Sequence, residues 1–148
     1  MCLQAPAHLR ADWQLLTVLR QILIAAQPEE GCALLLGVRQ GHGWQLGRIW
    51  PCRNVWSVPG ARNHRFAIDP REQLLAQKWG REQGLEVLGS AHSHPASGPV
   101  PSATDCRLCV GPALMVILGA GGQAAELLGW WIPEPPALPQ LLPWRIGS

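Results

Sequence analysis

The stretch from Leu88 to Asp105 reads LGSAHSHPASGPVPSATD. An apolar run ends in His92 and His94, and a loop rich in Pro, Gly and Ser then leads to Ser102 and Asp105. Side chains alternate between two faces of an extended strand, so residues two apart point the same way and both imidazoles can reach one point. A loop of about ten residues is long enough to bring Asp105 back to that point.

Two imidazoles and one carboxylate are the protein ligands of a catalytic zinc site, whose fourth position stays open for water. A His-x-His pair alone is weak evidence, and Ser102-x-x-Asp105 is also an ordinary capping box at a helix start. Both interpretations can hold together, because capping would turn Ser102 and Asp105 toward the histidine strand. We therefore expect Zn²⁺ at His92, His94 and Asp105.

Hydrolysis at such a site also needs a general base near the attacking water. Zinc lowers the pKa of a bound water to about 7, and a carboxylate within hydrogen-bond reach can take its proton and pass it to a leaving amine. Glu29 and Glu30 are the upstream candidates for this role.

The 148 residues fit a single domain that can bury a core without disulfides. Five cysteines are an odd number without a secreted context, so we interpret them as reduced thiols. The N-terminus lacks the features of a signal peptide, and the longest apolar segment, Leu15 to Ala26, is too short to span a bilayer. A cytoplasmic location without a membrane partner is the expectation.

The charge pattern argues against nucleic acid as a partner, because the net charge is only +2 and the arginines are scattered. Charged residues make up 15% of the chain, against a typical value of about 25%, and there are eight tryptophans. These tryptophans could fill the core or form a partner-binding face, and the sequence leaves both open. A homodimer is one option for such a face.

Hydrophobic periodicity predicts two long helices. Apolar residues recur at intervals of three and four from Leu9 to Ala26. A second helix is predicted from Asp69 as N-cap, with Pro70 at its first position and Glu72 completing a capping box, and it should end at about Gln83. The residues expected to form its packing stripe are Leu74, Leu75, Lys78 and Trp79.

Short apolar runs bounded by turn residues predict five strands, at Gly31–Arg39, Trp44–Trp50, Leu85–Ala91, Ala113–Leu118 and Gln123–Ile132, and the run Phe66–Ile68 is also strand-like. The first two should form a β-hairpin. A short helix is expected after Asp105, and the Pro-rich segment from Pro133 should be an extended arm. The chain is thus predicted to be an α/β protein with one mixed sheet flanked by helices, divided into a domain (1–132) and a tail (133–148).

Four separated elements of this sequence agree with one known pattern. They are Pro28-Glu29-Glu30-Gly31-Cys32-Ala33-Leu34-Leu35-Leu36-Gly37, Phe66-Ala67-Ile68-Asp69-Pro70, His92-Ser93-His94-Pro95 and Ser102-Ala103-Thr104-Asp105. Together they resemble the JAMM (MPN-plus) zinc metalloprotease family over roughly Pro28 to Leu118. One departure is Ala33, which stands where glycine is usual.

The resemblance implies a sandwich like that of the cytidine deaminases, with His92, His94 and Asp105 as zinc ligands. It also implies that Glu30 is the general base and acid, because the family's glutamate stands two residues after the proline and two before the cysteine. Ser102 would help to stabilise the oxyanion.

The resemblance further implies a class of substrate. Enzymes of this family hydrolyse peptide or isopeptide bonds after the C-terminal Gly-Gly of ubiquitin-like proteins. Without the long insertions of the deubiquitinating members, the chain is similar to the compact prokaryotic type, which processes ubiquitin-like sulfur-carrier proteins. The extended tail of such a carrier would add as a strand beside an exposed edge near Cys52 to Val55.

Two other functions stay open. Cys106-x-x-Cys109 has a spacing suited to a zinc or redox module, although a zinc ribbon would need a second pair. A non-catalytic MPN-type scaffold is the other alternative, although every expected ligand is present. The zinc nucleobase deaminases use His-x-Glu, and this chain has no glutamate two residues after His92.

Overall fold

The computed structural model describes residues 4–109, 112–121 and 124–147. The strands in this part are β1 (His8–Asp12), β2 (Cys32–Gln40), β3 (Gly43–Cys52), β4 (Glu86–Ser93), β5 (Ala113–Leu118), β6 (Leu127–Ile132), β7 (Gln140–Leu142) and β8 (Trp144–Gly147). The helices are α1 (Trp13–Ala25), α2 (Pro70–Glu82) and α3 (Ala103–Leu108), with a 3-10 turn at Pro59–Ala61. The strands form one mixed sheet in the order β7-β6-β5-β4-β2-β3-β1-β8. The predicted α/β fold class is confirmed.

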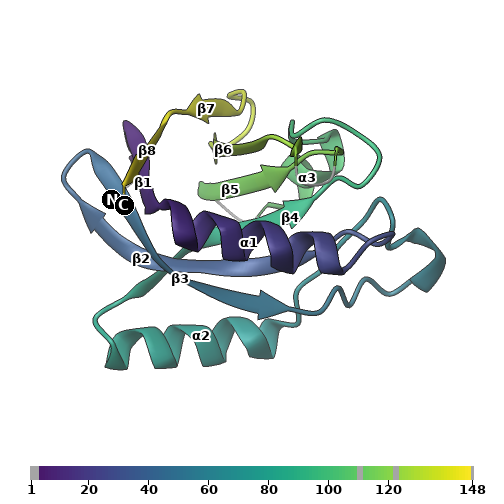
Figure 1. Cartoon of the computed structure of the whole chain (residues 1–148), viewed down its shortest axis with the longest axis horizontal. Coiled ribbons are helices and arrows are strands. Elements are labelled where there is room, and N and C mark those ends of the chain that lie inside the picture. Colours follow the sequence, from purple (N-terminus) through teal and green to yellow (C-terminus); the bar gives the residue numbers. More distant parts are fainter. Residues whose placement is uncertain (1–3, 110–111, 122–123, 148) are drawn as a thin grey trace.

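The sheet curls around α1, and α2 lies against the opposite face (Figure 1). Alternation along β2 divides its side chains between the two helices. Leu35 packs in the same cluster as Leu19 of α1, whereas Leu34 and Leu36 pack with Ala76 of α2. Because residues from seven of the eight strands join the cluster around α1, the larger core lies on that face.

The first segment differs from the prediction, because the expected helix over Leu9–Ala26 is a strand followed by a shorter helix. β1 pairs with both β3 and β8. Ala11 is buried, and the Asp12 side chain accepts a hydrogen bond from the Leu15 N–H (2.7 Å), which starts α1. The apolar stripe extends back to Leu9, but pairing with two strands overrides that local preference.

The bounds of α2 agree with the prediction, but of the predicted packing stripe only Trp79 packs against the sheet, and Lys78 is exposed. Leu74 and Leu75 are 65% and 53% exposed, so their assignment to the packing stripe is wrong. The sheet instead receives Ala76 and Gly80, which are both buried. A Cβ at Gly80 would lie 2.9 Å from the Leu85 carbonyl oxygen, so small residues allow the helix to approach the sheet closely.

The cap of α2 is also simpler than predicted. The Asp69 carboxylate accepts from the N–H of Arg71 (2.9 Å), as an N-cap should. The predicted capping box with Glu72 is wrong, because the Glu72 N–H donates to the backbone carbonyl of Asp69 and not to its side chain, and Oε2 of Glu72 accepts from the indole Nε1 of Trp50 (2.7 Å). This bond ties the start of α2 to β3.

The central strands agree well with the prediction, whereas the strand-like run Phe66–Ile68 forms no strand. The hairpin consists of β2 and β3, and the strand predicted over Leu85–Ala91 is β4, which pairs with β2 and β5. The last predicted strand, Gln123–Ile132, starts later as β6 at Leu127, and Gln123 itself lies outside the described residues. The helix expected after Asp105 is α3, which already contains that residue.

The Pro-rich segment from Pro133 is not the extended arm that was predicted, because it supplies both edge strands of the sheet. β7 pairs with β6, and β8 pairs with β1. Only Pro143 separates these two strands in sequence, although they stand at opposite ends of the strand order. The sheet must therefore curl until its edges approach each other. Leu142 is 2% exposed, and the indole of Trp144 donates to the Leu127 carbonyl oxygen (2.8 Å).

We expect Leu142→Ala to lower the free energy of unfolding by about 2–4 kcal/mol, because it opens a cavity in the core around α1. Leu141 is the matched control, since it is 53% exposed and its truncation should change that free energy by less than about 0.5 kcal/mol. Urea unfolding followed by tryptophan fluorescence measures both. Equal losses would contradict the packing of β7 on the core.

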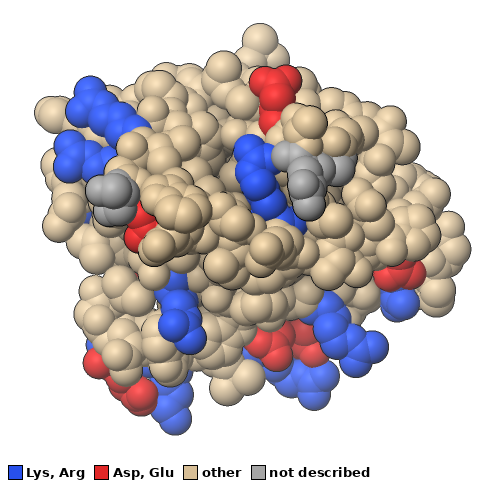
Figure 2. Space-filling view, viewed as in Figure 1, with Lys and Arg blue, Asp and Glu red and all other residues tan. Residues whose placement is uncertain are grey.

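The face of the molecule in Figure 2 carries few charges. Basic and acidic side chains lie in scattered groups, and broad uncharged areas separate them. Neither sign gathers into a continuous field on this face.

Among the described residues, none of the helices has the length and apolar character that crossing a membrane would require.

Candidate metal centre

The end of β4 places His92 and His94 on the face of the sheet that α2 covers. Ala91 packs in the core around α1, so alternation turns His92 to the other face. β4 is paired on both sides, and the N–H of His94 donates to the Leu118 carbonyl oxygen (2.8 Å). Both histidines are buried, and His92 is inaccessible. Their backbone is therefore held firmly.

The first turn of α3 brings Asp105 to the histidines. The predicted capping box is present: the Asp105 N–H donates to Oγ of Ser102, and the Ser102 N–H donates to Oδ2 of Asp105, both at 2.9 Å. Burial alone would raise the pKa of Asp105, but the adjacent imidazoles of His92 and His94 and the N–H of Ser102 outweigh it and hold that pKa below its usual range. Asp105 is thus a carboxylate.

Three side-chain atoms converge at this point. Nε2 of His92 lies 3.1 Å from Nε2 of His94, and each of these nitrogens lies 3.1 Å from Oδ2 of Asp105. Zinc bonds of about 2.0–2.1 Å in a tetrahedral arrangement hold neighbouring ligand atoms roughly 3.3 Å apart, so the spacing suits such an ion. The structure thus brings together the three predicted ligands, and the group could hold a metal ion.

The hydrogen bonds of His94 favour a cation here. Nδ1 of His94 lies 2.8 Å from the Gly98 carbonyl oxygen, so Nδ1 carries the proton and Nε2 of the neutral ring is an acceptor. That acceptor faces the carboxylate oxygen of Asp105, which is also an acceptor. Two acceptors this close repel each other unless a proton or a metal ion lies between them. A bound cation would satisfy both atoms.

Phe66 orients the other ligand ring. Its ring stacks on His92 with centroids 4.4 Å apart and planes 21° from parallel. Nδ1 of His92 has no hydrogen-bond partner in the described part of the chain, so ring packing holds this imidazole. The sequence places Phe66 in a motif but does not reveal this contact.

Glu30 lies just before β2 and is 5% exposed. Oε1 of Glu30 is buried without a hydrogen-bond partner among the residues that the structure describes. Burial raises the pKa of this carboxyl to about 7, against the opposing influence of His94. A carboxyl with that pKa can accept and return a proton at neutral pH. Glu29 is only half-buried, so Glu30 is the more shielded from water of the two candidates.

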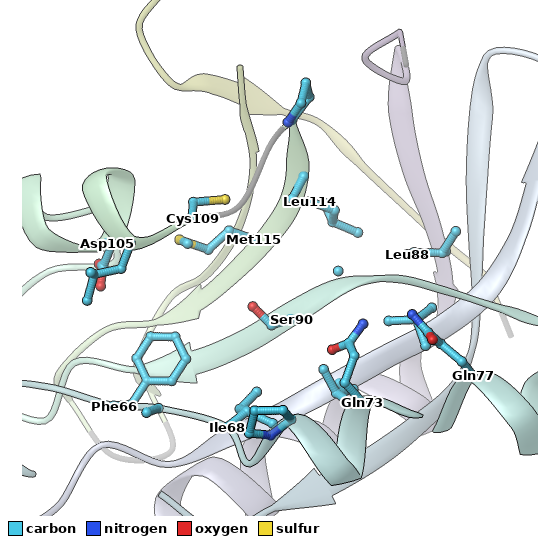
Figure 3. Close-up of a pocket in the computed structure, with 18 of the residues that line it drawn as sticks. Phe66, Ile68, Gln73, Gln77, Leu88, Ser90, Asp105, Cys109, Leu114 and Met115 are labelled. Atoms are coloured by element: carbon cyan, nitrogen blue, oxygen red, sulfur yellow. The ribbon is translucent and has the colours of Figure 1, made fainter. Parts of the chain in front are cut away.

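A groove of about 950 Å³ opens beside the cluster, and we call it the α2 groove. It lies between α2 on one side and α3 and β5 on the other, with Ser90 of β4 on its floor (Figure 3). Gln73 and Leu74 line it from α2, Met115 lines it from β5, and Asp105 stands at its end. Elements far apart in sequence form this groove, so no local sequence pattern indicates it.

The edge expected to receive a substrate strand near Cys52 to Val55 is closed at Val55. β3 ends at Cys52, and the N–H of Val55 donates to the Ala67 carbonyl oxygen (2.9 Å). The expectation is wrong at this residue because the loop after β3 folds back and uses that donor itself.

Cys106 and Cys109 lie near the cluster without joining it. Cys106 is in α3 and Cys109 is its C-cap, and the candidate metal group of the described residues contains neither. Burial raises the pKa of both thiols, which disfavours the thiolate that binds metals. Cys32, Cys52, Cys106 and Cys109 form no disulfide within the described ranges, and Cys2 lies outside them.

Residues 13–133 match the family described as prokaryotic homologs of the JAB domain. A probable TtuB-protein conjugate cleaving protease of Thermus thermophilus is 32% identical over 114 residues, which are 77% of this chain and 72% of that protein. Desampylase of Haloferax volcanii is 30% identical over 62% of each chain, and desampylase of Pyrococcus furiosus is 28% identical over 87% of this chain and 91% of its own.

Solved structures share the fold over nearly the whole chain. A protein of Desulfitobacterium hafniense superposes with a TM-score of 0.84 at 29% identity, covering 95% of this chain and 93% of its own. A protein of Salinibacter ruber gives a TM-score of 0.70 at 27% identity, covering 94% and 92%.

Proposed function

Because the chain belongs to the family of prokaryotic homologs of the JAB domain, we propose that it is a zinc-dependent peptidase or isopeptidase. Its substrate would be the bond after the C-terminal Gly-Gly of a ubiquitin-like or sulfur-carrier protein. The names of the similar proteins, a TtuB-conjugate protease and two desampylases, support this substrate class. The observation that carries the proposal is the convergence of His92, His94 and Asp105, beside a buried Glu30 whose carboxyl interacts electrostatically with His94 and Asp105.

Zinc would be held by Nε2 of His92, Nε2 of His94 and Oδ2 of Asp105. When bound, it would polarise the scissile carbonyl and lower the pKa of water at the open position. The Ser102 amide and the Gly98 carbonyl keep the ligands in place, through their bonds to Asp105 and His94.

Glu30 would transfer a proton from the attacking water to the leaving amine. Its carboxylate takes a proton from the attacking water as the water oxygen bonds to the carbonyl carbon. It then returns this proton to the leaving amine as the C–N bond breaks, which leaves a carboxylic acid and an amine. The acid then gives up its own proton at neutral pH, so the final products are a carboxylate and an ammonium group. Ser102 would donate its hydroxyl hydrogen to the oxyanion, since Oγ of Ser102 serves only as an acceptor in the helix cap.

The α2 groove would receive part of the carrier, because it starts beside Asp105 and is mainly apolar. Leu74 lines the groove, whereas its neighbour Leu75, which is also exposed, does not. We expect Leu74→Lys to raise KM about tenfold, since it places a charge against apolar substrate atoms, and Leu75→Lys to leave KM unchanged. Steady-state kinetics on a carrier fusion measure both, and equal effects would remove the groove from substrate binding.

The direct test uses a ubiquitin-like carrier joined through its Gly-Gly terminus to a reporter peptide. The zinc-loaded protein should release the reporter, and mass spectrometry should place the cut after the second glycine. A chelator should stop the reaction and added zinc should restore it. Absence of cleavage across a panel of carriers, with zinc bound, would favour the non-catalytic scaffold.

A further inference from the structure

Asn54 lies in the loop after β3 and connects parts of the chain that are distant in sequence. Its side-chain nitrogen, Nδ2, lies within hydrogen-bond distance of three backbone carbonyl oxygens, which share its two hydrogens: those of Glu30 (3.1 Å), Arg62 (3.3 Å) and Arg65 (2.9 Å). Two of these carbonyls belong to the loop, and the third belongs to the candidate base. One carboxamide thus joins the loop to the residue before β2.

The oxygen of the same carboxamide joins the two ends of the loop. Oδ1 of Asn54 accepts from the N–H of Trp56 (3.1 Å) and from the N–H of Ala67 (3.3 Å). The N–H of Val55 donates to the Ala67 carbonyl oxygen (2.9 Å). Both ends of the segment Val55–Ala67 are therefore fixed at Asn54.

Both backbone polar groups of Glu30, its N–H and its carbonyl, form hydrogen bonds with the loop. The Glu30 N–H donates to the Arg62 carbonyl oxygen (2.7 Å), and the Glu30 carbonyl accepts from Asn54. The next residue bonds to the histidine strand: the Gly31 N–H donates to Oγ of Ser93 (2.8 Å), and the Ser93 N–H donates to the Gly31 carbonyl oxygen (3.0 Å). Glu30 thus sits between the loop and β4.

The same loop supplies part of the surroundings of the metal group. Phe66 stacks on His92, and Trp56, Arg65, Phe66 and Ala67 all line the α2 groove. A displacement of the loop would therefore move the glutamate, a ligand ring and a groove wall together.

We propose that Asn54 is a positioning residue, which locks the Val55–Ala67 loop to Glu30 so that the base and one groove wall face the metal group as a unit. Only a carboxamide offers both two hydrogens and an acceptor oxygen on one short side chain. Aspartate keeps the acceptor and loses the donors. This inference rests on the proposed peptidase function for its kinetic consequences but not for its structural ones.

The test compares Asn54→Ala and Asn54→Asp with Asn63→Ala. Asn63 is the matched control, because it lies in the same loop, is exposed, and within the described residues its side chain bonds to the ring of His64 alone. Asn54→Ala should lower kcat about 100-fold, since a displacement near 1 Å of a reacting group costs that much. Zinc content should stay at the wild-type value, and Asn63→Ala should behave as wild type.

Amide hydrogen exchange of the zinc-free protein gives a readout that does not depend on activity. Asn54→Ala should speed exchange at Glu30, Trp56 and Ala67 at least tenfold, without a matching change in the core strands. Asn54→Asp should keep Trp56 and Ala67 protected, because its oxygens still accept from them, and should still lose kcat and the protection of Glu30.

Several outcomes would overturn the inference. These are wild-type kcat in Asn54→Asp, unchanged exchange in both variants, or a loss of kcat that Asn63→Ala reproduces. If Asn54→Ala does not fold, Asn54→Asp decides on the same criteria. A wild-type protein that binds zinc and cleaves nothing would refute the peptidase, while exchange at Glu30 would still decide whether Asn54 holds it.

Discussion

Glu30→Gln should lower kcat by roughly 10³-fold or more and leave zinc binding intact. The amide has nearly the shape of the acid but cannot take a proton from water, and general-base catalysis contributes about 10²–10⁴-fold. Glu30 is buried and is not among the three converging ligand groups, so the metal should remain. Cleavage kinetics of a carrier fusion and elemental analysis of the same sample measure the two effects.

Glu29→Gln is the matched control for this change. Glu29 is adjacent but only half-buried, and its substitution should alter kcat by less than about twofold if its carboxylate takes no part. If Glu29→Gln lost the activity and Glu30→Gln kept it, the base would have been assigned to the wrong residue.

His92→Ala should remove zinc and, with it, all measurable hydrolysis. The change takes one of three protein ligands from a buried group, and alanine offers no replacement. The wild type should contain about one zinc per chain by elemental analysis. The apoprotein should still fold, because the cluster around α1 does not include this residue.

Cys106→Ala serves as the control for His92→Ala. It lies one residue from Asp105 but outside the converging group, so zinc should remain at about one per chain. Zinc retained by His92→Ala and lost by Cys106→Ala would point instead to the thiol-based module.

The metal group could be predicted from sequence because the rules that build it are local. Alternation along a strand aligns His92 with His94, and a capping box aims Asp105 at them. Each rule involves only a few neighbouring residues, so it does not depend on contacts with distant parts of the chain. The strands β2, β4 and β5 were predictable for the same reason, since their apolar runs are short and bounded by turns.

Features that depend on residues distant in sequence could not be predicted from the sequence. Leu74 continues an apolar pattern on α2, yet it lies on a groove wall instead of in the core. The sequence pattern of β1 predicts a helix, but its backbone pairs with β3 and β8 instead. Asn54 gave no signal at all, because its role depends on carbonyl oxygens at Glu30, Arg62 and Arg65 that only folding brings together.

The pairing of β1 with β8 affects how the chain folds. These strands come from opposite ends of the described chain, and contacts so distant in sequence form slowly. Until β8 docks, the outer edge of β1 exposes N–H and C=O groups that another chain can pair with. Damage to the final strands should therefore appear first as aggregation during refolding, and only afterwards as any loss of turnover in the molecules that escape it.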